Sequence, residues 1–199
     1  MIGRQLEKEM LQRALDRKTA QIVVVYGRRR VGKTFLVNEF FNNSYAFKHT
    51  AVSPLEKGAT SGMMRLQLAE FYYSMKTYGL KSDAQCPENW VEAFHLLQEL
   101  LDSKSDGSNQ VIFIDELPWM DTPKSNFIAA FSYFWNSWAS MVPQLKLIVC
   151  GSSTTWMLAK FIGDKGGLYG RVTRQIYLAP FSLGETEQFL NGLKDLALT

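Results

Sequence analysis

The sequence predicts a three-layer α/β protein with a mainly parallel sheet, and three observations support this prediction. Strand-like apolar runs alternate with segments of helical spacing along the whole chain. Several of these runs are apolar throughout, which is typical of strands that are covered on both faces. The first run leads through a glycine-containing loop into a helix. In a sheet of this kind the ligand lies at the carboxyl ends of the strands.

The elements of the first half follow from periodicity and from breaker residues. Apolar residues recur every three to four positions in the helical segments, whereas the strands are continuous or alternating apolar runs. Clusters of Asn, Ser, Pro and Gly separate them. In chain order we expect a helix at Leu6–Arg17, a strand at Ile22–Tyr26, a helix at Thr34–Phe41, a strand at Tyr45–Val52, a loop at Ser53–Gly62, and helices at Met64–Tyr78 and Trp90–Leu101 on either side of a breaker stretch at Lys81–Pro87.

The second half repeats the alternation. Its first strand is a short apolar run that suits burial on both faces, and Ser182 with Glu185 three residues later forms a capping-box pattern at the start of the last helix. In chain order we expect a polar turn at Ser103–Asn109, a strand at Val111–Ile114, a helix at Lys124–Met141, a strand at Leu145–Cys150, a helix at Thr154–Phe161, a loop at Gly163–Gly170, a strand at Arg171–Leu178 and a helix from Ser182.

Composition limits the class of protein. The 199 residues are 46% hydrophobic and 21% charged, which suits one globular domain rather than a disordered chain. The net charge of +3 permits an anionic ligand but is too small to predict nucleic-acid binding by itself. Cys86 and Cys150 cannot form a disulfide framework, so we expect reduced thiols. The N-terminus lacks a signal core, and no apolar run approaches the roughly 18 residues of a membrane span. These features predict a cytoplasmic location without membrane contact.

Gly27 to Thr34 reads G-x-x-x-x-G-K-T and joins the first strand to the next helix. This pattern is typical of a loop whose backbone N–H groups surround a phosphate. Gly27 and Gly32 permit tight turns and close approach of the backbone, and the helix N-terminus adds unpaired N–H donors. We therefore expect Lys33 to contact the β- and γ-phosphates of a nucleoside triphosphate and the Thr34 hydroxyl to bind Mg²⁺.

The other positions of this stretch complete the predicted nucleotide-binding segment. Arg28, Arg29 and Arg30 fill the variable positions. Each of them either braces a phosphate or belongs to a solvated positive rim, and both interpretations are open. Val31 and Phe35 flank the glycine, lysine and threonine of the motif and are included among the expected nucleotide contacts.

Two adjacent carboxylates follow the strand that begins at Val111. Asp115 is expected to hold Mg²⁺, directly or through a water, and Glu116 to accept a proton from the attacking water. A polar strand exit is the alternative explanation for an isolated acidic pair. Here the pair follows a phosphate loop by about eighty residues, which strengthens the catalytic interpretation and leaves room for an extra strand between the two motifs.

Two further candidates come from later strand ends. Ser152 follows a buried strand and is expected to orient the water or sense the γ-phosphate, while the alternative for the hydroxyls at this strand end is a Ser or Thr N-cap for the helix that starts near Thr154. Arg171 and Arg174 precede the last predicted strand. We favour Arg171 as a guanidinium that neutralises phosphate charge, in its own chain or from a neighbouring subunit, because flexible glycines precede it. The alternative is that either arginine simply faces solvent.

The histidines and the aromatic run are expected to have structural roles. His49 and His95 have no nearby metal-ligand partners in the sequence, so packing or surface roles are favoured for both. The aromatic residues between Phe131 and Trp138 cover most sides of a helix, which favours a core or a partner interface over the stacking of bases.

Several of these motifs together resemble one known family. The segments IGR near the start, GRRRVGKT, VIFIDE, the strand ending in CGSS, and LYGRVTRQIYLAPFS are similar to the prokaryotic archaeal-type ATPases, usually grouped with the STAND branch of AAA+-like P-loop NTPases. The resemblance covers nearly the whole chain. It implies a P-loop core of the additional-strand, RecA- and AAA+-like type, ATP with Mg²⁺ as ligands, and hydrolysis coupled to a conformational switch.

The same resemblance implies further features. Gly3 and Arg4 fall on the motif that lies near the adenine in this family. Similar proteins continue into a winged-helix segment and often an effector domain, so residues 1–199 are expected to be the ATPase part of a longer protein. Self-association, a protein partner or nucleic acid would then depend on the region beyond Thr199.

These observations predict an Mg²⁺-dependent domain that binds ATP and hydrolyses it slowly in a regulatory or DNA-associated ATPase. Three alternatives are weighed against this prediction. The first is a nucleotide-dependent binding switch with negligible turnover, and the second is a small-molecule kinase, for which no acceptor-binding motif is recognisable. The third is a nucleic-acid binder that uses the arginines and aromatic residues, which would show strongly salt-dependent DNA binding.

Overall fold

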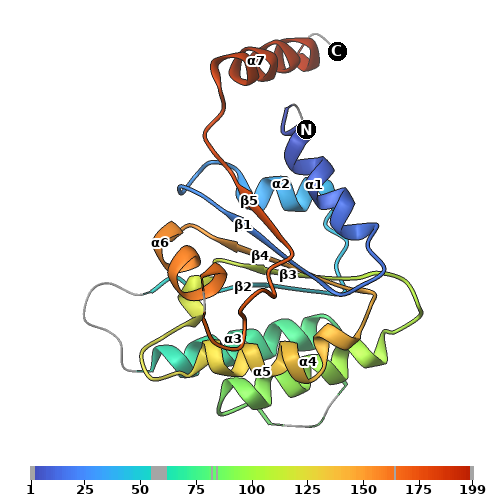
Figure 1. Cartoon of the computed structure of the whole chain (residues 1–199), viewed down its shortest axis with the longest axis vertical. Coiled ribbons are helices and arrows are strands. Elements are labelled where there is room, and N and C mark those ends of the chain that lie inside the picture. Colours follow the sequence, from blue (N-terminus) through green and yellow to red (C-terminus); the bar gives the residue numbers. More distant parts are fainter. Residues whose placement is uncertain (1–2, 55–61, 82, 84, 164, 198–199) are drawn as a thin grey trace.

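The protein forms one five-stranded parallel sheet in the computed structural model, which describes residues 3–54, 62–81, 83, 85–163 and 165–197 (Figure 1). The order of the strands across the sheet is β2-β3-β4-β1-β5. The strands are β1 (Gln21–Tyr26), β2 (Phe47–Thr50), β3 (Gln110–Asp115), β4 (Leu145–Gly151) and β5 (Arg174–Tyr177). The expected α/β class and parallel sheet are confirmed.

Helices cover both faces of the sheet and make three layers (Figure 1). One face carries α1 (Gln5–Leu15) and α2 (Lys33–Phe40), and the other carries α3 (Met63–Thr77), α4 (Trp90–Ser103) and α5 (Phe127–Ser137). The shorter elements are η1 (Leu117–Met120), η2 (Ala139–Met141), α6 (Thr154–Trp156) and η3 (Met157–Ile162). The last helix, α7 (Leu183–Ala197), lies apart from the sheet on the side of α1.

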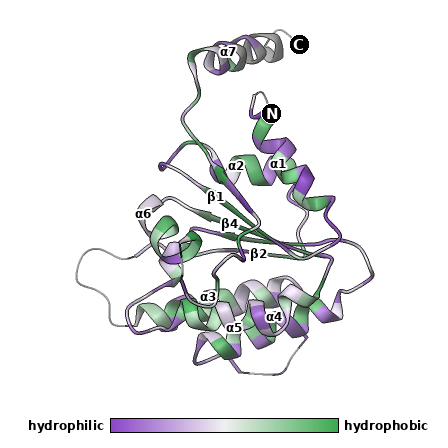
Figure 2. Cartoon of the chain, viewed as in Figure 1, coloured by the Kyte–Doolittle hydropathy of each residue, from purple (hydrophilic) through white to green (hydrophobic). Residues whose placement is uncertain are grey.

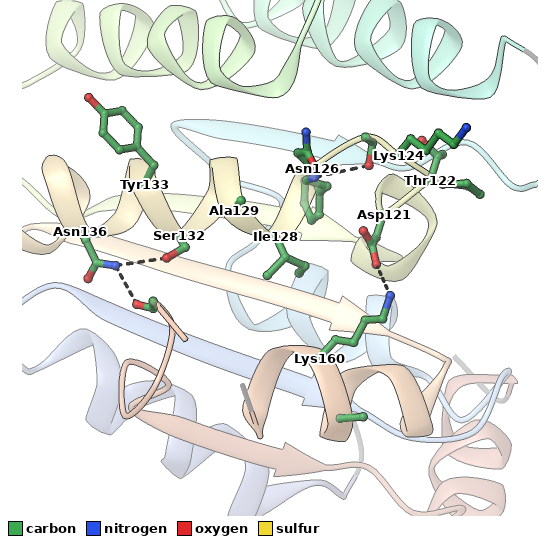
Figure 3. A pocket seen from close by; sticks show the side chains of 15 residues that line it. Asp121, Thr122, Lys124, Asn126, Ile128, Ala129, Ser132, Tyr133, Asn136 and Lys160 are labelled. Atoms are coloured by element: carbon green, nitrogen blue, oxygen red, sulfur yellow. Dashed lines mark hydrogen bonds and ion pairs between the residues drawn. The ribbon is translucent and has the colours of Figure 1, made fainter. Parts of the chain in front are cut away.

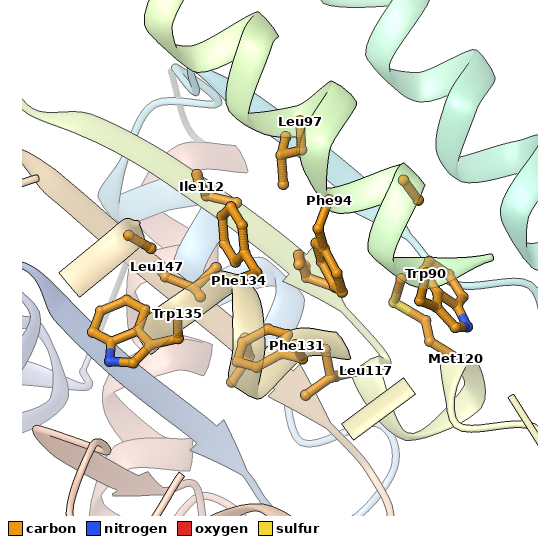
Figure 4. Close-up of a cluster of buried hydrophobic side chains, with 14 of the residues drawn as sticks. Trp90, Phe94, Leu97, Ile112, Leu117, Met120, Phe131, Phe134, Trp135 and Leu147 are labelled. Carbon is orange, nitrogen blue, oxygen red and sulfur yellow. The ribbon is translucent and has the colours of Figure 1, made fainter. Parts of the chain in front are cut away.

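Two apolar clusters hold these layers together. Figure 2 shows the central strands as the most hydrophobic part of the chain, which agrees with strands buried on both faces. In the larger cluster, Phe94 of α4 stacks on Phe134 of α5 with ring centroids 5.0 Å apart, and Leu147 of β4 belongs to the same cluster (Figure 4). In the aromatic run of α5, Phe131, Phe134 and Trp135 are therefore buried in the core, as expected. Tyr133 of the same helix is exposed.

The position of β4 determines the layout of the functional edge. It pairs with β1 on one side and with β3 on the other, so an extra strand separates the phosphate-loop strand from the acidic strand. All pairings are parallel, and the carboxyl ends of β1, β3 and β4 therefore meet at one edge. The additional strand implied by the resemblance is present.

Three predicted elements differ most from the structure. The helix expected over 124–141 is shorter, because Lys124 and Asn126 have left-handed φ values of 62° and 53° and because the chain leaves the helix at Trp138 for the 3₁₀ turn η2. The last strand begins at Arg174 rather than Arg171. The helix expected over 154–161 becomes the π-helical η3 after one α-helical turn. Loop residues 55–61 and breaker residues 82 and 84 lie outside the described residues.

The strand β4 contains a buried cation that periodicity alone would not suggest. Lys146 has no exposed surface, and its Nζ donates to the carbonyl oxygens of Arg17, Thr19 and Pro143 at 2.6, 2.8 and 2.9 Å. These acceptors lie on the segment that leads into β1 and on the turn before β4. Lys146 thus joins the two strands at the edge opposite the phosphate loop. Among the described residues, no helix is long and apolar enough to cross a membrane.

His49 packs in the core between β2 and α3. Its Nδ1 lies 2.9 Å from Ser74 Oγ, and the Ser74 hydroxyl donates to the Glu70 carbonyl, so Nδ1 must carry the proton of the neutral ring. The buried Nε2 has no hydrogen-bond partner among the described residues. Burial lowers the pKa of His49 to about 4, because protonation would place an unpaired charge in the core.

This burial predicts a pH-dependent stability. The unfolded state takes up a proton below its pKa of 6.5, whereas the folded state does so only near 4. The free energy of unfolding should therefore decrease between these pH values as the pH falls, by at most about 3 kcal/mol. Urea titrations at several pH values should show a flatter dependence for His49→Leu than for the natural chain. The exposed His95 provides the control, since His95→Leu should keep the natural slope.

Candidate nucleotide-binding site

The phosphate loop lies between β1 and α2, at the carboxyl edge of the sheet. Gly27 has φ 151°, and Gly32, the N-cap of α2, has φ 92°. The Lys33 side chain is buried, and its Nζ donates to the carbonyl oxygens of Gly27 and Arg28 at 3.1 and 2.9 Å. The ammonium group is thus held inside the loop beside the N-terminus of α2, where an anion is stabilised.

Gly27 is also in close contact with the chain that follows β5. A Cβ atom at this position would lie 2.3 Å from the Leu178 carbonyl oxygen, and the Leu178 N–H already donates to Tyr26. Because that neighbour is backbone, it cannot rotate away. We expect Gly27→Ala to destabilise the protein by about 2 to 4 kcal/mol. Urea denaturation should measure this loss, with Gly107→Ala as a control for positive φ without a steric neighbour.

Thr34 and Asp115 connect the loop to the acidic strand. The Thr34 hydroxyl donates to Asp115 Oδ2 at 2.7 Å. Burial is the main cause that raises the pKa of Asp115, and the hydrogen bond from Thr34 opposes it. A hydroxyl and a carboxylate at this separation are hard oxygen ligands, so the pair fits Mg²⁺, which prefers few protein ligands together with phosphate oxygens. A cation there would also favour the ionised form of Asp115.

Glu116 and Ser152 form the other side of the acidic end. Glu116 has a left-handed φ of 52°, and its Oε2 accepts hydrogen bonds from the backbone N–H and the hydroxyl of Ser152 at 3.0 and 2.8 Å. The hydroxyl is therefore used on Glu116. The alternative of a Ser or Thr N-cap is met in position by Ser153, which is the N-cap residue of α6 but makes no side-chain capping bond.

Comparison with known proteins identifies the family of the chain. Residues 1–197 match the family described as an ATPase domain predominantly from Archaea. The chain belongs to this family. The resemblance inferred from the sequence is thus confirmed, and the chain is an ATPase domain of the archaeal-type P-loop class with the ATP binding that this family implies.

One curated relative is similar in sequence, and two solved structures are similar in fold. An uncharacterized protein of Methanocaldococcus jannaschii is 25% identical over 191 residues, which cover 94% of this chain and 38% of the relative. A Walker-type ATPase of Pyrococcus abyssi superposes with a TM-score of 0.63 at 19% identity and covers 99% of this chain and 59% of its own. The Drosophila ORC bound to DNA superposes with a TM-score of 0.60 at 13% identity, and the match covers 96% of this chain and 46% of the ORC chain. The chain thus spans only part of each.

Arg4 of the ATPase domain lies beside the phosphate loop but is directed to other protein groups. It is 6% exposed, and its guanidinium donates to the carbonyl oxygens of Ala179 and Val31 at 2.7 and 3.4 Å. It also pairs with Glu7 at 3.3 Å and lies 4.4 Å from the centroid of the Phe181 ring. Arg4 therefore joins the N-terminus, the loop and the segment before α7. Its predicted place near the adenine stays a prediction.

The remaining loop residues are arranged differently from one another. Val31 packs against the smaller core cluster, and Phe35 is 55% exposed on α2. Arg28, Arg29 and Arg30 are exposed, and Arg29 lies over the ring of Trp119 with Cζ 5.7 Å from the ring centroid. Sequence reasoning missed Trp119. Its position three residues after Glu116 was the available signal.

Arg171 is not brought to the site of its own chain. It is exposed and lies just before β5, where Thr173 N–H donates to the carbonyl of Ile22 near the start of β1. The phosphate loop leaves the other end of β1, after Tyr26. The interpretation in which Arg171 acts within its own chain is therefore wrong, because the length of β1 separates the two. Arg174 pairs with Val23 and is similarly remote.

A cavity of about 1000 Å³ lies elsewhere in the ATPase domain, along α5. Asp121 pairs with Lys160 of η3 at 3.0 Å on one wall, and the Asn136 side chain donates to the Gly167 carbonyl and to Ser132 at 2.7 and 3.3 Å (Figure 3). Its lining includes none of the residues from Gly27 to Thr34. Cavity volume therefore does not identify the nucleotide site, which is defined by the loop and the acidic strand end.

Proposed function

We propose that this ATPase domain binds ATP with Mg²⁺ and hydrolyses it slowly. The observation that carries the proposal is the hydrogen bond of 2.7 Å between Thr34 and Asp115, because it brings the phosphate loop and the acidic strand end together at one edge of the sheet. Thr34 and Asp115 are 81 residues apart in the chain, so their contact depends on the fold and not on local sequence. A buried ammonium, oxygen ligands and a second carboxylate then surround the place where the terminal phosphates would lie.

Each residue has a proposed role. The backbone between Gly27 and Gly32 binds the phosphates, and Lys33 would exchange its two carbonyl contacts for phosphate oxygens. Thr34 and Asp115 would hold Mg²⁺, which neutralises phosphate charge when it is bound. Glu116 accepts a proton from the attacking water, and Ser152 orients the Glu116 carboxylate. Water rather than a second substrate is the proposed acceptor, since no acceptor-binding motif was recognised.

A neighbouring copy would complete the site. Because Arg171 is exposed at the opposite edge of the sheet, it can reach a triphosphate only in another molecule. We propose this trans role, together with self-association of the protein. A regulatory or DNA-associated role is also proposed, supported by the similarity of the fold to that of the Drosophila ORC, which was solved with DNA. The cytoplasmic location stays a prediction.

Calorimetric titration with ATP, GTP and ADP, with and without Mg²⁺, tests the binding part of the proposal. Tight binding of ATP that strengthens with Mg²⁺ is expected. A coupled assay of phosphate release then separates hydrolysis from a binding switch with negligible turnover. If no nucleotide binds, the proposed function is wrong. If ATP binds but phosphate is never released, even when protein concentration favours self-association, the switch is the better description.

A further inference from the structure

Arg29 and Trp119 form a contact between the two halves of the site. The Arg29 guanidinium lies 5.7 Å from the centroid of the indole ring, within the range of a cation–π interaction. Trp119 belongs to η1, the turn that begins after Glu116, and its backbone N–H donates to the Glu116 carbonyl at 2.9 Å. Arg29 therefore leans from the phosphate loop toward the acidic strand end.

Trp119, whose ring contacts Arg29, is anchored through its backbone. The Trp119 carbonyl accepts a hydrogen bond from Gln67 Nε2 at 3.0 Å, and the Gln67 side chain is fully buried. The Gln67 amide is itself held by the backbone of Val52. Gln67 Nε2 donates to the Val52 carbonyl at 2.7 Å, and the Val52 N–H donates to Gln67 Oε1 at 3.1 Å. Trp119 also packs against the larger core cluster. Its backbone is therefore anchored, and its partly buried side chain packs on the core.

Three other cations near the site have protein partners or lie elsewhere, while Arg28 and Arg30 are exposed in the loop, and of the three loop arginines it is Arg29 that contacts the turn after Glu116. Lys33 is bonded to two carbonyl oxygens inside the loop. Arg4 is bonded to Val31 and Ala179 and paired with Glu7. Arg171 lies at the opposite edge of the sheet. Arg29, in contrast, contacts a neutral ring, so its charge is not neutralised by that contact and remains available to an anion.

We propose that Arg29 binds the terminal phosphate of ATP and that Trp119 is the positioning residue that holds its guanidinium on the acidic side of the site. This inference rests on the proposed function. A phosphate held by the loop and faced by Glu116 would have Arg29 on the side formed by η1. A guanidinium binds phosphate through two parallel hydrogen bonds, which an ammonium cannot reproduce. ADP lacks this phosphate, so Arg29 would set the preference for ATP over ADP.

Affinities for ATP and ADP, measured by calorimetry with Mg²⁺ on the whole chain, test the role of Arg29. In Arg29→Ala the affinity for ATP should fall by about tenfold or more, while the affinity for ADP should change by less than about twofold. Arg29→Lys should recover only part of the ATP preference. Arg28→Ala removes the same charge from the adjacent position and should reduce the preference less. Equal losses for both nucleotides, or equal losses in the two alanine variants, would overturn the proposal.

The role of Trp119 has its own readout. Trp119→Phe keeps an aromatic face and should keep most of the preference for ATP over ADP, whereas Trp119→Leu should lose this preference. Adding Trp119→Leu to Arg29→Ala should cause no further loss of the preference, because both changes remove the same contact. ATP should also change the tryptophan emission of the natural chain, and this change should disappear in Arg29→Ala and in Trp119→Phe. A Trp119→Leu variant that keeps the full preference contradicts the positioning role. If that variant does not fold, the arginine variants and the emission change still decide.

These experiments separate the inference from the proposed function on which it rests. Normal binding of ATP with an unchanged preference in Arg29→Ala would refute the inference alone. Absence of nucleotide binding by the natural chain would refute the proposed function. Loss of binding in Lys33→Ala together with an ATP-selective loss in Arg29→Ala is the expected combination.

Discussion

Replacing Lys33 by alanine should reduce the affinity for ATP by about 100-fold or more. The ammonium group is the one side-chain cation that the structure places inside the loop, within hydrogen-bonding distance of the Gly27 and Arg28 carbonyl oxygens, among the residues described. Hydrogen bonds from a charged donor to phosphate contribute about 1.5 to 3 kcal/mol each. Loss of two such bonds corresponds to the expected change. Calorimetric titration with ATP and Mg²⁺ measures it directly.

The variant also needs evidence that it is folded. Lys33 is buried, so its removal leaves two carbonyl oxygens without their donor, and circular dichroism and thermal melting must accompany the titration. Lys18→Ala is the matched control, because Lys18 is exposed and precedes β1. The control should bind ATP as the natural chain does. A folded Lys33→Ala variant with natural affinity would show that the loop does not bind the phosphates in the proposed way.

Replacing Glu116 by glutamine should abolish measurable hydrolysis while ATP binding persists. The amide cannot accept a proton from water, and general-base catalysis contributes about 10²- to 10⁴-fold to a rate. The Ser152 N–H and hydroxyl that now bond to Glu116 Oε2 can still donate to the amide oxygen, so the geometry around the side chain should be preserved. A coupled phosphate-release assay under single-turnover conditions, beside a binding titration, checks both statements.

A substitution of the neighbouring Asp115 should give a different result from Glu116→Gln, and this difference makes the test of Glu116 specific. Asp115→Asn changes the residue bonded to Thr34 and should weaken the effect of Mg²⁺ on ATP binding rather than only the rate. If Glu116→Gln releases phosphate at the natural rate, then Glu116 is not the base. Equal, very low release by both the natural chain and the variant would support the binding switch instead.

Much of the fold could be predicted because it depends on local patterns. Continuous apolar runs identified β1, β3 and β4, since strands covered on both faces require apolar side chains on both sides. Alternation of apolar and polar residues identified β2 and β5, which are buried on one face. The capping box was also visible locally: Ser182 N–H donates to Glu185 at 2.9 Å, and Glu185 N–H donates back to Ser182 Oγ at 3.3 Å. The predicted helix ends at Lys124 and Met141 were wrong, because left-handed residues and a 3₁₀ turn have weak sequence signals.

The sequence by itself determined the strand-loop-helix unit around Lys33, the acidic strand end and the alternation of strands with helices, because short-range spacing encodes each of these. Only the tertiary structure decided which side chains from different strands and turns come together, because this depends on the order of the strands in the sheet. Placing β4 between β1 and β3 brings Glu116 to Ser152, the direction of β5 takes Arg171 to the far edge, and the turn after β3 sets Trp119 beside Arg29. Such contacts join residues far apart in the chain, and their formation depends on the packing of the whole sheet.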